Sequence, residues 1–287
     1  MPLLLPTGLN EVLDLLAEHP EARVLAGGTD LLVRLRACGA SPGTIVSLER
    51  VAGLGRIEAL ETATGPAVRI GATATMTDLL RSDTVHQRLP LLHRAASAFA
   101  APTVRNAATL GGNICTASPA ADTLPALLVM NASVELASRR GARILPIPHF
   151  VLGPGRTALE PGEVLSGVVV PVPRGFTFHH FEKVGQRRAM AIAVVSLAAM
   201  LAVEDGRIRE ARLAWGSVGP TVIRSPEAEA ILRGGRLTLS ALAEAARAAR
   251  RAVAPISDIR ASADYRRQVA GNLLLRLADL PGRGPGD

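Results

Sequence analysis

The stretch ATLGGNICTASPAADTLPALL, residues 108–128, is where the chain departs most clearly from a regular pattern. Its Gly-Gly and Ser-Pro pairs predict that it cannot form a regular core helix. Glycines permit close backbone approach, and hydroxyl and N–H groups donate hydrogen bonds, so the stretch suits a loop folded around a flat or anionic group. From Ala120 onward a helical pattern resumes, and the N-terminus of such a helix favours negative charge. Taken alone, the stretch is equally consistent with an ordinary surface connection.

A second glycine loop lies earlier in the chain. Residues 24–26 read as a short buried strand that runs into GGTD at 27–30, and a helix is predicted over residues 31–37. In this order of strand, loop and helix, backbone N–H groups at the helix start can hold a phosphate. The loop lacks the Lys and Ser or Thr of a Walker A motif and is weak evidence by itself. Together with residues 108–128, it becomes a second anion-compatible loop.

Composition bounds the class of protein. A chain of 287 residues suggests about two domains, and with 48% hydrophobic but only 2% aromatic residues, its core must consist of Ala, Leu and Val. No run is long and apolar enough to span a bilayer, and the first residues lack the pattern of a signal peptide. Cys38 and Cys115 form no CxxC and cannot ligate zinc or an iron–sulfur cluster by themselves. We therefore expect a reduced, cytoplasmic protein with no metal site and no integral membrane segment.

The net charge of +7 is spread along the chain, with Arg interleaved with Glu and Asp. No basic patch with a recognisable nucleic-acid motif is present, so we expect no nucleic-acid partner. Of the 32 Lys and Arg residues, all except Lys183 are Arg. A composition that disfavours lysine but keeps one indicates a need for a compact point charge there, although chance survival explains this fact equally well.

A change of composition at residues 171–175, PVPRG, predicts a domain boundary. Before it, hydrophobic periodicity predicts helices over residues 7–18, 31–37, 77–81 and 89–100, and short strands over residues 24–26, 45–48, 68–71, 134–137, 144–146 and 164–170. After it, strands are predicted over residues 176–184, 192–203 and 207–216, followed by helices over residues 226–233, 240–253 and 263–278. Asp205-Gly206 is the turn signal of a hairpin between the last two strands.

No arrangement of side chains typical of nucleophilic or acid–base catalysis stands out. The acidic residues are scattered, and His179 and His180 point to opposite faces of a predicted strand, so they are not joint metal ligands. If the protein takes part in catalysis, a bound cofactor must carry out the difficult chemistry. Two glycine loops of this kind can hold a cofactor that carries a diphosphate.

Four stretches together resemble one known family. They are AGGTDLL at 26–32, TLGGNICTASPAADTLPALL at 109–128, FEKVGQRRAMAIAVVS at 181–196 and ISDIRASADYRR at 256–267. The chain resembles, over nearly its whole length, the FAD-binding medium subunit of the molybdenum hydroxylases, the xanthine dehydrogenase and carbon monoxide dehydrogenase family. The resemblance implies an α+β protein with a two-lobed FAD-binding domain of the PCMH (vanillyl-alcohol-oxidase) type over residues 1–172. A C-terminal α+β domain of antiparallel strands and helices would occupy residues 176–280, with a tail over residues 281–287.

The resemblance also implies residues that bind FAD. Backbone donors would wrap the diphosphate at Ala26, Gly27, Gly28, Thr29, Asp30 and Leu31. The second loop, on the diphosphate and ribityl chain, would consist of Thr109, Gly112, Asn113 and Thr116. Phe99 would lie near the adenine, Asp122 would accept hydrogen bonds from ribose hydroxyls, and Val164 and Leu165 would line the isoalloxazine ring. Lys183 would approach the polar edge of the flavin, where a cation stabilises the reduced anion.

By the same resemblance, the chain is an oxidoreductase subunit with no catalytic residue of its own. A large molybdopterin subunit would oxidise the substrate, two [2Fe–2S] clusters of a small subunit would relay the electrons, and the FAD would pass them to NAD or a quinone. We expect a dimer of such heterotrimers. The alternatives are a free-standing FAD-dependent oxidase of the same fold and a non-catalytic scaffold subunit.

Two features depart from the family pattern. Gly28 stands where the family often has Asn or His, so any side-chain contact at that position is lost. The four-cysteine insertion of the 4-hydroxybenzoyl-CoA reductase branch is absent, which disfavours that branch.

Overall fold

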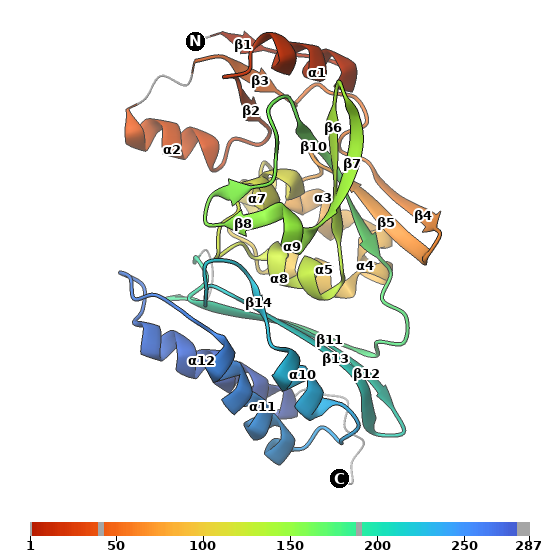
Figure 1. The fold of residues 1–287 in the computed structure, drawn as a ribbon, viewed down its shortest axis with the longest axis vertical. Coiled ribbons are helices and arrows are strands. Elements are labelled where there is room, and N and C mark those ends of the chain that lie inside the picture. Colours follow the sequence, from red (N-terminus) through yellow and green to blue (C-terminus); the bar gives the residue numbers. More distant parts are fainter. Residues whose placement is uncertain (1, 40–42, 188–190, 280–287) are drawn as a thin grey trace. The chain divides into compact units, whose positions relative to one another are not determined.

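The computed structural model describes residues 2–39, 43–187 and 191–279, and the chain divides into two compact units (Figure 1). Residues 1–118 and 130–172 form the first unit, and residues 119–129 and 173–287 form the second. The sequence predicts a single break near residue 172. The structure has that break, but it groups residues 119–129 with the C-terminal unit. The predicted tail over residues 281–287 lies outside the described residues.

The N-terminal lobe of the first unit is a small parallel sheet with a helix against it. The sheet order is β1-β3-β2, with β1 at Leu3–Leu4, β3 at Ile45–Ser47 and β2 at Arg23–Leu25. Helix α1 (Leu9–Glu18) places Val12, Leu13 and Leu16 in a core with Val46 of β3. Helix α2 (Leu31–Cys38), predicted over residues 31–37, buries none of its residues. A buried apolar face therefore does not determine its position.

The second lobe of this unit is a five-stranded antiparallel sheet. Its order is β4-β5-β10-β6-β7, with bounds Ile57–Thr62, Gly65–Gly71, Val164–Pro171, Ser133–Ser138 and Gly141–Pro146. Strand β4 was missed in the sequence because Glu58 and Glu61 interrupt its apolar pattern. A register shift between Leu165 and Gly167 marks a bulge where β10 pairs with β6. The remaining short strands are β8 (Val151–Gly153) and β9 (Arg156–Thr157).

Short helices accompany this sheet. They are α3 (Met76–Arg81), α4 (Asp83–Arg88), α5 (Pro90–Ser97), α6 (Pro102–Arg105), α7 (Leu110–Cys115) and α9 (Ile147–Phe150). The prediction that Gly111-Gly112 would break a helix is wrong, because both glycines lie inside α7. A Cβ atom at Gly111 would lie 2.7 Å from the carbonyl oxygen of Ala72, so the glycine lets α7 pack directly on a neighbouring backbone. Pro102 opens α6 as its first residue, a position where proline loses no hydrogen bond.

The second unit is a four-stranded antiparallel sheet with helices. The sheet order is β11-β12-β13-β14, with bounds Phe178–Val184, Val195–Glu204, Arg207–Gly216 and Ile223–Arg224. The helices are α8 (Thr123–Val129), α10 (Pro226–Leu232), α11 (Leu239–Ala252) and α12 (Ala263–Leu275), followed by the 3₁₀ turn η1 (Arg276–Asp279). Every second residue of β12 and β13 faces one side of the sheet, and those side chains, among them Leu197 and Trp215, pack in one core with α10, α11 and α12. Gly216 belongs to the opposite face, where a Cβ would lie 3.2 Å from Pro125 of α8. None of the helices in the described ranges has the length and apolarity needed to cross a membrane.

A buried carboxylate fixes α10 to this sheet. Glu229 accepts hydrogen bonds from the backbone N–H of Leu213 at 2.9 Å and from two guanidinium nitrogens of Arg224 at 2.9 and 2.8 Å. On the same helix, Glu227 pairs with Arg251, and both of these side chains are exposed. The two glutamates therefore differ in burial while they share a helix.

We expect Glu229→Ala to lower the free energy of unfolding by about 3–5 kcal/mol, because it leaves a guanidinium and a buried N–H without their acceptor. Glu227→Ala is the matched control and should cost about 0–1 kcal/mol, since an exposed ion pair is screened by solvent. Urea unfolding followed by circular dichroism measures both. Equal losses in the two variants would show that the buried carboxylate does not fix α10.

Candidate cofactor-binding site

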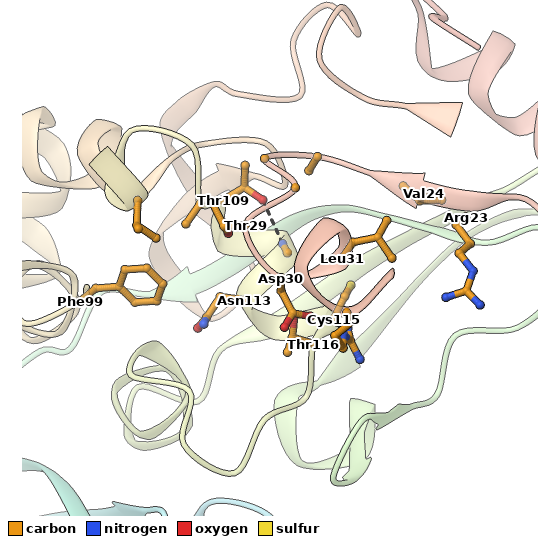
Figure 2. A pocket seen from close by; sticks show the side chains of 17 residues that line it. Arg23, Val24, Thr29, Asp30, Leu31, Phe99, Thr109, Asn113, Cys115 and Thr116 are labelled. Atoms are coloured by element: carbon orange, nitrogen blue, oxygen red, sulfur yellow. Dashed lines mark hydrogen bonds and ion pairs between the residues drawn. The ribbon is translucent and has the colours of Figure 1, made fainter. Parts of the chain in front are cut away.

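A cavity of about 480 Å³ opens in the first unit between the two glycine-containing stretches (Figure 2). Eleven of the predicted FAD-binding residues line it: Ala26, Gly27, Gly28, Thr29, Asp30, Leu31, Phe99, Thr109, Gly112, Asn113 and Thr116. Figure 2 shows Phe99 at one end of this group and Arg23 at the other, with Thr29, Asn113 and Asp30 between them. The fold thus brings together segments that are about 70 to 90 residues apart in sequence.

The first loop carries a row of unused hydrogen-bond donors. Strand β2 ends at Leu25 and α2 begins at Leu31, so residues 26–30 belong to neither element. Within the described ranges, none of the backbone N–H groups of residues 27–30 donates to another protein group. Such donors need an external partner, and a row of them at a helix start is suited to an anion. This loop therefore fits the diphosphate of a dinucleotide.

Gly27 is required by a close crossing of two backbone segments. A Cβ atom at position 27 would overlap the carbonyl oxygen of Ala107, which lies just before the second glycine stretch. Gly28 has a φ of +70°, a left-handed conformation that side chains rarely adopt. A bulkier residue here would also meet Leu32, because a Cβ would lie 2.9 Å from its Cδ1. The absence of side chains at Gly27 and Gly28 allows the two loops to approach each other, and it also leaves space for a ligand.

The second stretch contributes side chains rather than backbone donors. Thr109 caps α7, its Oγ1 accepting from the N–H of Gly112 at 3.1 Å. The N–H of Leu110 donates to Ala74 O, and the N–H of Gly111 donates to Ala72 O, each at 2.9 Å. Because these donors are satisfied within the protein, they are not available to a ligand. Asn113 and Thr116 line the cavity from α7 and its C-terminal end.

The residues that line the cavity carry a small excess of positive charge. Asp30 accepts from Thr116 Oγ1 at 3.1 Å and forms an ion pair with Arg34, so its carboxylate is bound within the protein. Arg23 also lines the cavity, which leaves one cation more than the anions among the lining residues. Burial raises the pKa of the Cys115 thiol to about 12, so that side chain stays uncharged. The cavity therefore favours an anionic ligand.

The remaining lining residues were missed in the sequence. Arg23, Val24, Arg34, Val104, Ala108 and Cys115 all lie on the same segments as the predicted residues. Their proximity to the two motifs was the only available signal. A further residue, Arg105, does not line the cavity but donates to the carbonyls of Phe99 and Ala100 at 2.7 and 2.9 Å. It fixes the backbone that carries Phe99, where Ala100 has a φ of +33°.

Four predicted residues do not line this cavity. Val164 and Leu165 lie in β10 and are each 3% exposed; Val164 packs in the core beside α1. Asp122 and Lys183 belong to the second unit, where Lys183 Nζ donates to Asp122 Oδ2 at 2.6 Å. The roles assigned to these four residues by resemblance stay predictions. Among the described residues, no cluster of His, Cys, Asp or Glu could hold a metal ion.

The Asp122–Lys183 pair is buried, and burial dominates its electrostatics. Desolvation raises the pKa of Asp122 to about 6, although the charge and hydrogen bond of Lys183 act in the opposite direction. The second carboxylate oxygen, Oδ1, is buried and has no hydrogen-bond partner within the described residues. A buried acceptor without a partner is costly, so Oδ1 is suited to accept from a ligand hydroxyl.

Gly27→Ala should lower the melting temperature of the isolated chain, because the added methyl overlaps the backbone of Ala107. We expect a loss of several degrees, since a shift of this kind costs 1 kcal/mol or more in a chain of this size. Gly8→Ala is the control, because a Cβ there meets nothing within 4 Å. Thermal unfolding followed by circular dichroism measures both, and equal melting temperatures would contradict the close crossing.

The stability of the protein should also depend on the Asp122 carboxyl. Its folded pKa of about 6 lies above the ordinary value near 4, so the folded state binds the additional proton between these values. Its contribution to the free energy of unfolding should therefore fall by about 3 kcal/mol as pH rises from 4 to 6, and stay constant above that. In Asp122→Asn this fall should vanish, whereas Asp83→Asn, at an exposed position, should keep it. Urea unfolding at several pH values gives the slopes, and an unchanged slope in Asp122→Asn would rule out the raised pKa.

The comparisons with known proteins agree along nearly the whole chain. Residues 1–173 match the family model "FAD binding domain in molybdopterin dehydrogenase", and residues 180–279 match "CO dehydrogenase flavoprotein C-terminal domain". The xanthine dehydrogenase FAD-binding subunit of Escherichia coli O157:H7 is 36% identical over 90% of this chain and 88% of its own. The carbon monoxide dehydrogenase medium chain of Hydrogenophaga pseudoflava is 32% identical over 94% of this chain and 93% of its own.

Solved structures agree with these matches. A carbon monoxide dehydrogenase structure from Hydrogenophaga pseudoflava superposes with a TM-score of 0.90 and 32% identity, over 96% of this chain and 95% of that one. The structure of quinoline 2-oxidoreductase from Pseudomonas putida 86 gives a TM-score of 0.89 with 32% identity, over 96% and 94% of the two chains. The α+β fold with two lobes and a C-terminal domain is thereby confirmed. The chain belongs to the FAD-binding medium subunits of the molybdenum hydroxylases, the xanthine dehydrogenase and carbon monoxide dehydrogenase family of oxidoreductases.

Proposed function

We propose that the chain is the FAD-carrying electron-transfer subunit of a heteromeric molybdenum hydroxylase in the cytoplasm. It would receive electrons from the [2Fe–2S] clusters of a small subunit, which obtains them from a large molybdopterin subunit. It would deliver them to an acceptor such as NAD or a quinone. A dimer of these heterotrimers is the proposed assembly. The observation that carries the proposal is the row of unused N–H donors at residues 27–30, in a cavity formed by both family motifs.

The residues of the cavity fit the diphosphate and the parts of FAD next to it. Backbone N–H groups of residues 27–30 would donate to the phosphate oxygens, where the start of α2 also favours negative charge. Arg23 adds positive charge at the same cavity, where Arg34 is paired with Asp30. Asn113 and Thr116 offer polar side chains beside these donors, and Phe99 offers a ring for the adenine. When bound, FAD supplies a ring system that accepts and releases electrons singly or in pairs.

Asp122 and Lys183 are proposed to act on the flavin as a coupled pair. Asp122 Oδ2 already holds the ammonium, while the buried Oδ1 remains available for a hydroxyl of the cofactor. A pair of opposite charges has almost no net charge, so the ammonium is positioned by Asp122 rather than left as a free cation. Lys183 can still donate toward a developing negative charge, because an ammonium has three N–H donors.

The alternatives are distinguished by the isolated chain. A scaffold subunit would be colourless, whereas a flavin subunit should purify yellow or bind added FAD with the flavin absorbance. A free-standing oxidase would turn over small alcohols by itself; Asp30, the acidic side chain among the cavity-lining residues, is already bound by Arg34 and Thr116. We expect flavin binding with no turnover in the absence of partner subunits. Absence of FAD binding by the folded chain would overturn the proposal.

The charge of the pair should set the flavin midpoint potential. Asp122→Asn leaves Lys183 as an uncompensated cation, so the potential should rise, and about 30 mV corresponds to 1.4 kcal/mol for a two-electron couple. Lys183→Met should lower the potential less, because the buried Asp122 carboxyl then takes up a proton and restores neutrality. Lys183→Arg is the control that keeps the charge but changes its shape. Redox titration of the FAD-loaded protein at pH 7.5 measures all three, and an unchanged potential at full loading would separate the pair from the flavin.

A further inference from the structure

The loop that carries the aromatic residue of the cavity contains a strained backbone. This loop, residues 98–101, joins α5 to α6. Pro102 opens α6, and the residue before it, Ala101, is extended as a following proline requires, with φ −91° and ψ 160°. The reversal between the two helices falls on Ala100, whose φ of +33° lies in a region that a residue with a Cβ rarely adopts. Such strain persists only where the surrounding structure enforces it.

Arg105 holds this loop in its strained conformation. Its Nη1 donates to the carbonyl oxygen of Phe99 at 2.7 Å and to that of Ala100 at 2.9 Å. Two successive carbonyl oxygens that converge on one point repel each other, and a cationic donor between them offsets that repulsion. The main chain fixes both ends of the loop, because the N–H of Phe99 donates to Ala96 O and the N–H of Arg105 donates to Ala101 O.

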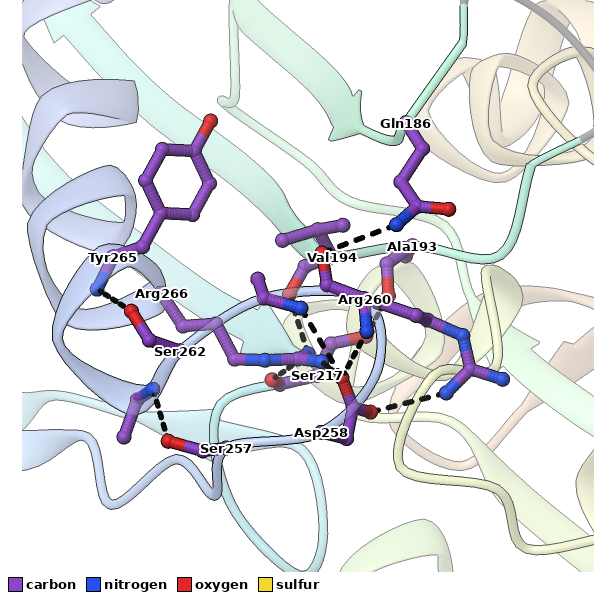
Figure 3. Close-up of polar contacts among 12 residues, drawn as sticks. Gln186, Ala193, Val194, Ser217, Ser257, Asp258, Arg260, Ser262, Tyr265 and Arg266 are labelled. Atoms are coloured by element: carbon purple, nitrogen blue, oxygen red, sulfur yellow. Dashed lines mark hydrogen bonds and ion pairs between the residues drawn. The ribbon is translucent and has the colours of Figure 1, made fainter.

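Arg266, a second arginine that binds main-chain carbonyls, joins distant segments of the second unit (Figure 3). It is 4% exposed. Its guanidinium donates to Val194 O at 2.8 Å, to Ser217 O at 3.1 Å and to Asp258 Oδ1 at 2.6 Å. Arg105 instead binds two adjacent carbonyls of one loop, five and six residues before it in the chain. What Arg105 fixes is therefore the conformation of that loop.

The fixed loop presents an aromatic ring to the cavity. Phe99 lines the cavity, and Figure 2 shows its ring at one end of the lining residues, with Thr29 and Asn113 next along. The direction of a side chain follows from its backbone, so the conformation of Ala100 helps to set where this ring lies. An aromatic ring near donors for a diphosphate is suited to stack on a nucleotide base. Because Arg105 does not line the cavity, it can affect such a base only through the loop or through its charge.

We propose that Arg105 is a positioning residue that makes the cavity selective for the dinucleotide FAD over the mononucleotide FMN. It keeps the ring of Phe99 in place before the ligand arrives. The adenine then meets a surface that is already ordered, so stacking contributes more fully to affinity. FMN has no adenosine half and gains nothing from this surface. This role rests on the proposed function, since it takes FAD as the ligand and Phe99 as the contact of its adenine.

The test compares the affinities of the full, flavin-free chain for FAD, ADP and FMN by isothermal titration calorimetry. ADP carries the adenine half of the cofactor, and FMN carries the flavin half. Arg105→Met keeps an unbranched side chain and removes its donors. We expect the Kd for FAD and for ADP to rise about tenfold, the order of magnitude of base stacking on an aromatic ring, with the Kd for FMN unchanged. Arg94→Met, which removes the same charge from an exposed position of α5, is the control and should change none of the three.

A double-mutant cycle shows whether Arg105 acts through Phe99. In a Phe99→Ala background, Arg105→Met should cause no further loss of ADP affinity, because the ring that it positions is gone. A further loss of similar size would mean that the guanidinium attracts the phosphates directly, and it would overturn the positioning role. Equal losses for ADP and FMN in the single variant would overturn it as well. Either result leaves the proposed function intact, whereas a wild-type chain that binds no FAD would overturn that function and this role together.

Discussion

The crossing of Gly27 with the backbone of Ala107 is the constraint on which the first unit depends. At that point two segments approach so closely that a Cβ atom has no space, which joins the start of α2 to the start of α7. Helix α2 buries none of its residues, so this crossing, rather than an apolar face, determines where its N-terminus lies. The row of N–H donors at residues 27–30 is positioned as a result. The positions of the donors that would face a ligand are therefore set by the packing of the main chain.

Much of the fold could be predicted because its elements follow local rules. The hairpin between β12 and β13 was placed by its Asp-Gly turn, and β13 was predicted with its observed bounds. Helices α10, α11 and α12 were found within a few residues by their apolar periodicity. Residues 27–30 were likewise predicted to be an anion-compatible loop, because a predicted strand precedes them and a predicted helix follows them. In each case the signal was contained within about fifteen residues.

The features that could not be predicted depend on contacts between distant segments. Gly111 and Gly112 read as helix breakers, yet tertiary packing against Ala72 makes helix α7 possible there. The pairing of Asp122 with Lys183 joins residues 61 positions apart, and no local pattern signals it. Arg105, which fixes the backbone around Phe99, acts through carbonyl groups, and these are invisible in an amino-acid sequence. Arg266 belongs to the same class, because two of its three acceptors are main-chain carbonyls.

The assignment of residues 119–129 to the second unit has a consequence for how the chain is made. This segment holds α8, whose apolar residues include Leu124, Leu127 and Val129, and it contacts β12 and β13. The ribosome completes α8 well before it reaches Gly216, the last residue of β13. At roughly 5–20 residues per second, the helix waits several seconds for its binding surface. Packing of α8 therefore waits for the strands of its own unit, and a cut at residue 172 would separate α8 from the sheet that it contacts.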